Sequence, residues 1–270
     1  MSLPPDIPDL AGLLRQMIRD IPAILLENLV GIYLWGSLTY GAFDEACSDV
    51  DCIAVTTRNL DDREFAALDT WFSDAARRNP WVKRLDMRFV IENEFLDKAS
   101  RCCGFYHHTG RLVRHGSDGN PIIWMNIGQS GVTLWGKDAK LIAPSISDQC
   151  LNDALLLELE YLKEDLRSNA GDRWDKAFVH NAYAVLTACR ILYSAVHRNL
   201  ASKDEAADWA TERIPMQFRT VIAAAKENRL KNHGSTTPVM EQDAGRFVEF
   251  VTGEVRRKLG WPTSAGLPTP

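Results

Sequence analysis

The chain has 270 residues, of which 46% are hydrophobic and 25% are charged, and its formal net charge is -5. This composition excludes a disordered or fibrous protein, and the length allows one large domain or two ordinary ones, each with its own core. The acidic balance argues against a broad nucleic-acid surface, which is normally basic, and favours a small cationic partner.

Two features of the sequence bear on its location. The first residues lack the basic start and apolar core of a secretory signal, so we expect a cytoplasmic protein. The longest apolar neighbourhood, Ile21 to Trp35, is interrupted by Glu27 and Asn28. It is shorter than the uninterrupted run of about 18 residues that a membrane span needs, so we expect no membrane partner.

The cysteines show no C-x-x-C spacing, and we expect them to be reduced packing residues. A zinc site built from Cys102, Cys103, His107 and His108 is the alternative, but its ligand spacing differs from that of the usual structural sites. Neither these two histidines nor His115 is assigned any chemistry, because polar loop histidines are commonly just exposed.

The first half of the chain mixes helical and strand patterns. Apolar residues at helical spacing over 9–28 predict an amphipathic helix that Pro22 bends or divides. After it we expect a strand at 32–35, a short helix at 38–43, a strand at 50–56, a helix at 61–79 and a strand at 85–91. The segment 104–136 is irregular, with strand-like pieces at 111–114, 121–124 and 132–135, and is expected to form the rim of a cleft.

The second half reads as helical throughout. Helices are expected at 151–168, at 172–198, from 203 with Ser202 and Glu205 as a capping box, from Pro215, and at 241–259. We therefore place a domain boundary near Pro144, giving a catalytic domain at 1–145, a helical domain at 146–260 and a tail at 261–270. The predicted fold class is α+β: a mixed sheet with helices, followed by an α-helical bundle.

The most informative run joins Gly36-Ser37 to Asp49-x-Asp51. A glycine at the end of a strand allows a sharp turn and lets backbone N–H groups approach an anion, to which Ser37 adds a hydroxyl. Side chains alternate along a strand, so the two aspartates project to one face. Magnesium prefers oxygen ligands from one or two carboxylates together with substrate phosphates. The run therefore predicts a phosphate site beside a metal site.

A third carboxylate follows at Asp86, early in the strand at 85–91. It is our candidate to complete the metal shell of Asp49 and Asp51 and to accept a proton from an incoming hydroxyl as general base. Without the earlier motif, Asp86 reads as a strand-end aspartate beside Arg84 or Arg88.

Gly-Ser followed by D-x-D on the next strand resembles the nucleotidyltransferase superfamily. The helical half narrows the family: Leu186-Thr187 with Arg190 and Tyr193, then the run from Lys203 to Ala210, then Arg213-x-Pro215. These runs are similar to the aminoglycoside adenylyltransferases that modify streptomycin and spectinomycin.

This resemblance implies transfer of AMP from MgATP to a hydroxyl of a small cationic aminoglycoside or aminocyclitol, with antibiotic resistance as the role. It implies ATP as co-substrate, Mg²⁺ as cofactor, and contacts from Arg190 and Lys203 to the triphosphate, where arginine grips oxygens in pairs and lysine supplies a point charge. Read alone, Arg190 inside an apolar helix is a buried ion-pair partner. We expect a monomer or weak homodimer.

The sequence departs from the family pattern at several positions. The third carboxylate of the family is usually glutamate, whereas Asp86 has a shorter arm, and the family has an acidic residue at the position that matches His180. Trp174 and Asp175 lie near the aromatic and acidic pair used for streptomycin without aligning with it.

Two alternatives remain open at this point. One is a nucleotidyltransferase that acts on a protein or on RNA, since the signature does not choose an acceptor. The other is a non-catalytic partner of a toxin that keeps the fold as an interaction surface. The complete set of Asp49, Asp51 and Asp86, together with the long helical half, disfavours the second alternative.

Overall fold

The computed structural model describes residues 7–92, 94, 103–107, 110–114, 120–168, 177–230 and 239–261. The chain divides into two compact units, Met1–Ile146 and Ser147–Pro270. Among the described residues, no helix is long and apolar enough to cross a lipid bilayer.

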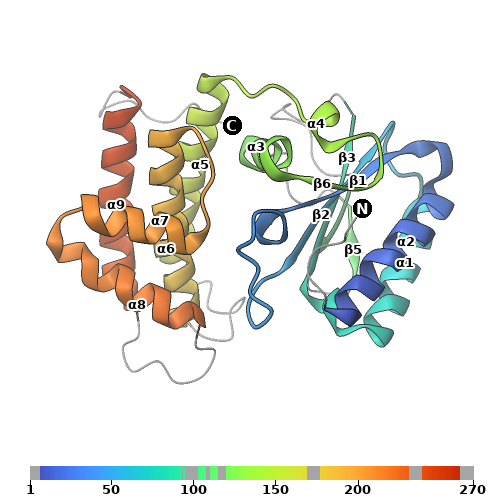
Figure 1. The fold of residues 1–270 in the computed structure, drawn as a ribbon, viewed down its shortest axis with the longest axis horizontal. Coiled ribbons are helices and arrows are strands. Elements are labelled where there is room, and N and C mark those ends of the chain that lie inside the picture. The colour runs from blue at the N-terminus through green and yellow to red at the C-terminus, as the bar shows by residue number, and fades with distance from the viewer. Residues whose placement is uncertain are drawn as a thin grey trace. The chain divides into compact units, whose positions relative to one another are not determined.

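The first unit is built on a six-stranded mixed sheet in the order β5-β4-β3-β2-β1-β6 (Figure 1). Its strands are β1 Leu29–Trp35, β2 Val50–Thr56, β3 Leu85–Ile91, β4 Gly104–His107, β5 Leu112–Val113 and β6 Val132–Gly136. Only β2 and β3 pair in parallel, and the other neighbours are antiparallel. A parallel pair needs a crossover connection, which the helix between β2 and β3 supplies. The mixed sheet with helices confirms the predicted fold class.

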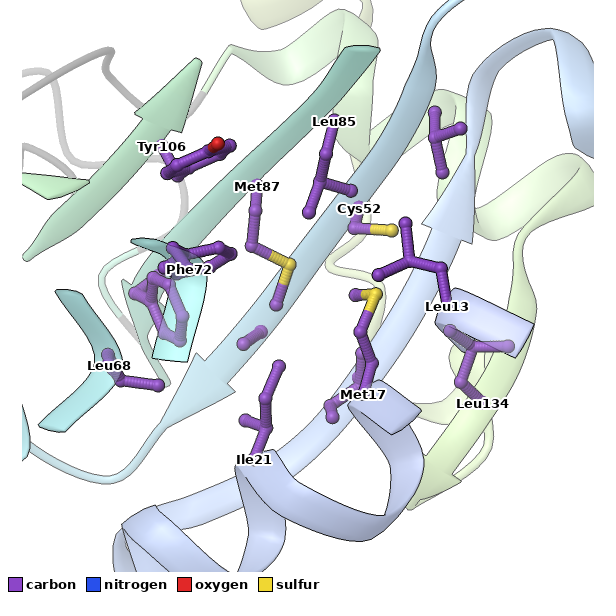
Figure 2. Close-up of a cluster of buried hydrophobic side chains, with 14 of the residues drawn as sticks. Leu13, Met17, Ile21, Cys52, Leu68, Phe72, Leu85, Met87, Tyr106 and Leu134 are labelled. Carbon is purple, nitrogen blue, oxygen red and sulfur yellow. The ribbon is translucent and has the colours of Figure 1, made fainter. Parts of the chain in front are cut away.

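Helices cover both faces of this sheet. On one face, α1 (Pro8–Leu25) and α2 (Asp62–Arg78) enclose a core in which Met17, Cys52, Phe72 and Met87 are fully buried (Figure 2). On the other face, α3 (Pro121–Ser130) and α4 (Ala139–Ile142) pack against strand side chains such as Tyr33. A sheet covered on both faces holds its strands in fixed register, and register decides which polar side chains meet at the strand ends.

Local signals explain the helix boundaries. Asp61 caps α2, accepting from the Glu64 amide at 2.8 Å while Glu64 accepts from the Asp61 amide at 2.9 Å. The basic pair Arg77 and Arg78 ends the helix, where positive charge complements the macrodipole. Pro22 does not divide α1, which is one helix of 18 residues.

The expected strand at 121–124 is wrong, because these residues form the first turn of α3. The Asn120 side chain accepts a hydrogen bond from the Ile122 amide at 2.9 Å, and Pro121 occupies a first-turn position that needs no N–H donor. The apolar run that suggested a strand is instead a helix segment. The short helix expected at 38–43 is a 3-10 helix at Gly36–Thr39, and β4 was not predicted.

The second unit is a bundle of α5 (Asp148–Arg167), α6 (Ala177–His197), α7 (Lys203–Arg213), α8 (Arg219–Leu230) and α9 (Glu241–Lys258) (Figure 1). Helix α6 packs against the other four and buries small side chains, including Ala182, Ala188 and Cys189, which allow close approach. The predicted capping box at Ser202 and Glu205 is confirmed, with bonds of 3.1 and 2.9 Å. The predicted helical half is therefore confirmed.

Replacing Phe72 with alanine should destabilise the first unit. The Phe72 ring is fully buried, stacks on Tyr106 at 4.2 Å and meets Phe89 edge-on at 6.3 Å between centroids. Removing it leaves a cavity, so we expect the free energy of unfolding to fall by about 3–5 kcal/mol in urea denaturation. Leu141→Ala, at a side chain that is 83% exposed, is the control and should change it by about 0.5 kcal/mol or less. Equal losses in the two variants would contradict this packing.

Candidate active site

A tight turn at Gly36 ends β1 and starts the site. Gly36 has φ +72°, a conformation that favours glycine, and opens the 3-10 helix Gly36–Thr39. Its amide donates to the Asn126 side chain at 3.2 Å, and the Thr39 hydroxyl donates to its carbonyl at 2.8 Å. Ser37 is half-buried in the same turn. These bonds attach the turn to α3. The role of Asn126 was not predicted from the sequence, although a polar asparagine within the apolar α3 could have suggested it.

The carboxylate of Asp51 lies directly against this turn. Trp35, just before Gly36, pairs with Asp51 across the strands. A Cβ atom on residue 36 would overlap Asp51 Oδ2 and lie 2.9 Å from its Cγ. Val50 and Cys52, which flank Asp51, are fully buried in the opposite core. The predicted alternation along this strand is therefore confirmed, and only glycine fits beside the carboxylate.

Asp49 precedes β2 and is exposed. Arg84 holds the loop that precedes Asp49. It donates to the Glu45 carbonyl at 2.6 Å and also to the Ser48 carbonyl. The Arg84 guanidinium lies 4.4 Å from the centre of the Trp81 ring, which fixes the arginine itself. This clamp restricts the chain next to Asp49.

The register of the parallel pair sets Asp86 beside Asp51 on the neighbouring strand. Asp86 is 7% exposed, and its carboxylate faces Arg88 at 2.9 Å and His107 at 3.4 Å. Burial raises the pKa of the Cys52 thiol well above its usual value, and the charges of Asp51 and Asp86 raise it further. The structure thus brings together two of the three predicted carboxylates.

These carboxylates are suitable ligands for a hard cation. Within the described ranges, no group of three or more His, Cys, Asp or Glu side chains is placed to hold a metal ion. Asp51 nevertheless presents oxygen donors next to the Gly36 turn, with Asp49 one residue before the strand, and such donors suit magnesium. Asp86 forms an ion pair with Arg88 at 2.9 Å.

Arg190 and Lys203 share a neighbour, Tyr183, in the second unit. Arg190 Nε donates to the Ala201 carbonyl at 3.1 Å, and Lys203 Nζ lies 4.8 Å from the centre of the Tyr183 ring. The pKa of Tyr183 is raised to about 12, mainly by burial and also by the charge of Glu158, while the charge of Arg190 opposes the shift. No role was predicted for Tyr183, although it lies two helical turns before Arg190 and hence on the same face of the helix.

His180 carries its own carboxylate partner. Its Nε2 lies 2.5 Å from Oδ2 of Asp165 in α5, and both side chains are buried. Trp174 and Asp175 lie outside the described residues. So do Cys102, His108 and His115, whereas Cys103 is buried and its thiol donates to the Phe89 carbonyl at 3.3 Å.

Gly36→Ala should displace the Asp51 carboxylate, because the new methyl group occupies its place. We expect Mn²⁺, as a magnesium substitute, to bind about 10-fold more weakly in calorimetric titration. Gly41→Ala is a matched control: Gly41 also has a positive φ, +74°, but an added Cβ meets nothing within 4 Å. Both variants carry the same backbone strain, so equal weakening would refute the contact.

Comparisons with known proteins show similar chains. Residues 142–254 match the family "Aminoglycoside adenylyltransferase, C-terminal domain". An aminoglycoside (3'') (9) adenylyltransferase from Escherichia coli is 26% identical, covering 94% of this chain and 98% of the relative. A spectinomycin 9-adenylyltransferase from Campylobacter jejuni is 23% identical, covering 91% and 95%.

A solved structure has the same fold. The spectinomycin adenyltransferase from Enterococcus faecialis, crystallised with ATP and spectinomycin, has a TM-score of 0.71 and 16% identity, covering 91% of this chain and 99% of that chain. The family match lies in the helical unit, and the curated relatives extend the similarity over both units. The helical unit thus matches the C-terminal domain of the aminoglycoside adenylyltransferases, and the chain is similar to curated members of that family over nearly its whole length.

Proposed function

We propose that this nucleotidyltransferase transfers AMP from MgATP to a hydroxyl group of an aminoglycoside or aminocyclitol, releasing pyrophosphate. The observation that carries the proposal is the adjacency of Asp51 and Asp86 at the Gly36 turn. This is the arrangement that nucleotidyl transfer needs: a carboxylate for the cation, a carboxylate for the proton, and a turn for phosphate.

The site residues of the first unit would each have a separate part in the reaction. Gly36 and Ser37 would bind phosphate oxygens, and Asp49 and Asp51 would hold Mg²⁺, which supplies charge stabilisation at the phosphate when bound. Asp86 would accept the hydroxyl proton as the acceptor oxygen forms a bond to the α-phosphorus. The bond from that phosphorus to the bridging oxygen breaks, and pyrophosphate leaves with the electron pair.

Arg190 and Lys203 would bind the triphosphate of ATP. Lys203 lies over the Tyr183 ring, and the charge of Arg190 acts on the same tyrosine. This supports a common ligand, because two neighbouring cations form a local site for an anion. Arginine offers paired donors to phosphate oxygens, and lysine neutralises the leaving pyrophosphate.

The acceptor is proposed from charge and from the relatives. The net charge of -5 suits a cationic small molecule. His180 occupies the position at which the family has an acidic residue. Asp165, which contacts His180, would supply a carboxylate there instead. Spectinomycin-type acceptors are therefore the first to test, and streptomycin the second. We place the activity in the cytoplasm, where ATP and Mg²⁺ are present, with the chain acting as a monomer or weak homodimer and conferring antibiotic resistance.

A panel assay separates this proposal from its alternatives. Pyrophosphate release from MgATP is measured with spectinomycin, streptomycin, other aminoglycosides, RNA and candidate proteins. Release with the small cationic acceptors alone supports the proposal. Release with RNA or protein alone would replace the acceptor class, and no release with any of them would favour a non-catalytic role.

Asp51→Asn should nearly abolish turnover with the best acceptor. The change keeps the shape of the side chain and removes the charge that holds the cation, so we expect kcat to fall at least about 100-fold while the unfolding transition is retained. A variant with the normal turnover rate would show that Asp51 does not take part in catalysis.

Asp86→Asn tests the base role separately. Loss of a general base lowers kcat by about 10²- to 10⁴-fold, and we expect KM for ATP to stay within about twofold because proton transfer is lost and nucleotide binding is kept. Near-normal kcat would make Asp86 a bystander.

A further inference from the structure

Arg88 is a nearly buried cation that the family signature does not account for. It lies on β3 two residues after Asp86, so both side chains project to the same face of the sheet. The side chain of Arg88 is 12% exposed and that of Asp86 is 10% exposed. A buried arginine is costly unless it is paired, so its place next to the proposed base calls for an explanation.

Two aromatic rings, one from β4 and one from β1, lie near the Arg88 guanidinium. Its guanidinium carbon lies 5.4 Å from the centre of the Trp35 ring and 5.2 Å from the centre of the Phe105 ring. Phe105 is its cross-strand partner on β4, and Trp35 ends β1. A planar guanidinium that already lies near aromatic side chains loses little further conformational freedom when it pairs with a carboxylate. Arg88 therefore holds the Asp86 carboxylate in a well-defined position.

The two oxygens of Asp86 have different surroundings. Oδ1 is shielded from solvent and lies 2.9 Å from Arg88 Nη1, yet neither atom has an aligned hydrogen bond within the described part of the chain. Their contact is thus an ion pair that fixes Oδ1 by charge. Oδ2 lies 3.4 Å from Nδ1 of His107, whose side chain is half exposed.

A divalent cation and the guanidinium compete for the same carboxylate. Direct coordination places a carboxylate oxygen about 2 Å from magnesium, so a metal bound to Asp86 would come within a few ångströms of Arg88. A metal ion and a guanidinium at such a short distance repel each other strongly in a poorly hydrated site. The Asp51 carboxylate lies against the Gly36 turn.

We propose that Arg88 is a positioning residue that keeps Asp86 out of the metal-binding set and leaves Oδ2 as the oxygen that accepts the proton. This inference rests on the proposed function, and it divides the three carboxylates by role: Asp49 and Asp51 hold the cation, and Asp86 is reserved for the proton. It also explains how the shorter arm of aspartate serves in place of glutamate, because the ion pair fixes where that arm points.

The test is a double-mutant cycle on the full-length protein, using Mn²⁺ with a non-hydrolysable ATP analogue and electron paramagnetic resonance to count free Mn²⁺. Asp86→Asn should leave Mn²⁺ affinity within about twofold, because Asp86 is not a ligand. Arg88→Met should tighten Mn²⁺ binding by about 10-fold, because the released carboxylate joins the metal. The double variant should lose that gain.

Kinetics provide the second readout. In Arg88→Met, kcat for pyrophosphate release should fall about 10- to 100-fold with KM for ATP within about twofold, and Arg88→Lys should recover part of kcat. Arg114→Met is the matched control: Arg114 also lies over an aromatic ring, Phe65 at 4.2 Å, and pairs with an aspartate, Asp62 at 2.7 Å, and it should change neither readout.

Two results would overturn the proposal. The first is weaker Mn²⁺ binding, by about 10-fold or more, in Asp86→Asn alone, which would make Asp86 a ligand. The second is an Arg88→Met variant that folds and keeps normal Mn²⁺ affinity and kcat. If Arg88→Met does not fold, Arg88→Gln, which removes the positive charge, is compared with Arg88→Lys, which keeps it. Absence of pyrophosphate release in the wild type would reject the proposed function, while the Mn²⁺ cycle would still decide the role of Arg88.

Discussion

The close approach of the Gly36 turn to the Asp51 carboxylate is the constraint on which the site depends. It leaves no room for a side chain at residue 36, so one position must combine a left-handed backbone with the absence of a Cβ atom. Asn126 fastens the same turn to α3. The backbone proposed to bind phosphate and the carboxylate proposed to bind the metal are therefore placed by the same contact, and a shift in either one moves the other.

A second constraint follows from the sheet. Parallel pairing of β2 and β3 sets two carboxylates, Asp51 and Asp86, on adjacent strands, where like charges disfavour each other. Arg88 offsets that repulsion from the same face. We infer that the ion pair with Arg88 gives Asp86 surroundings that differ from those of Asp51 beside the Gly36 turn. Separate environments for paired carboxylates allow them separate chemical roles.

The sequence predicted those parts of the site that depend on local spacing. Gly36 and Asp51 belong to one short motif, and alternation along a strand suffices to place the carboxylate. Asn126 and the aromatic support of Arg88 come from distant segments, so their roles depend on packing that no local pattern encodes. The error at 121–124 has the same origin: a short buried apolar run fits a strand or a helix equally well until its cap is identified.

The central proposal is that the Gly36 turn and the carboxylates beside it hold a metal-bound nucleotide. The most direct test is a crystal structure with Mg²⁺ and a non-hydrolysable ATP analogue. We predict Mg²⁺ on Asp49 and Asp51 and phosphate oxygens at the Gly36 turn. A nucleotide bound away from the Gly36 turn, or Mg²⁺ bound without Asp49 and Asp51, would contradict the account.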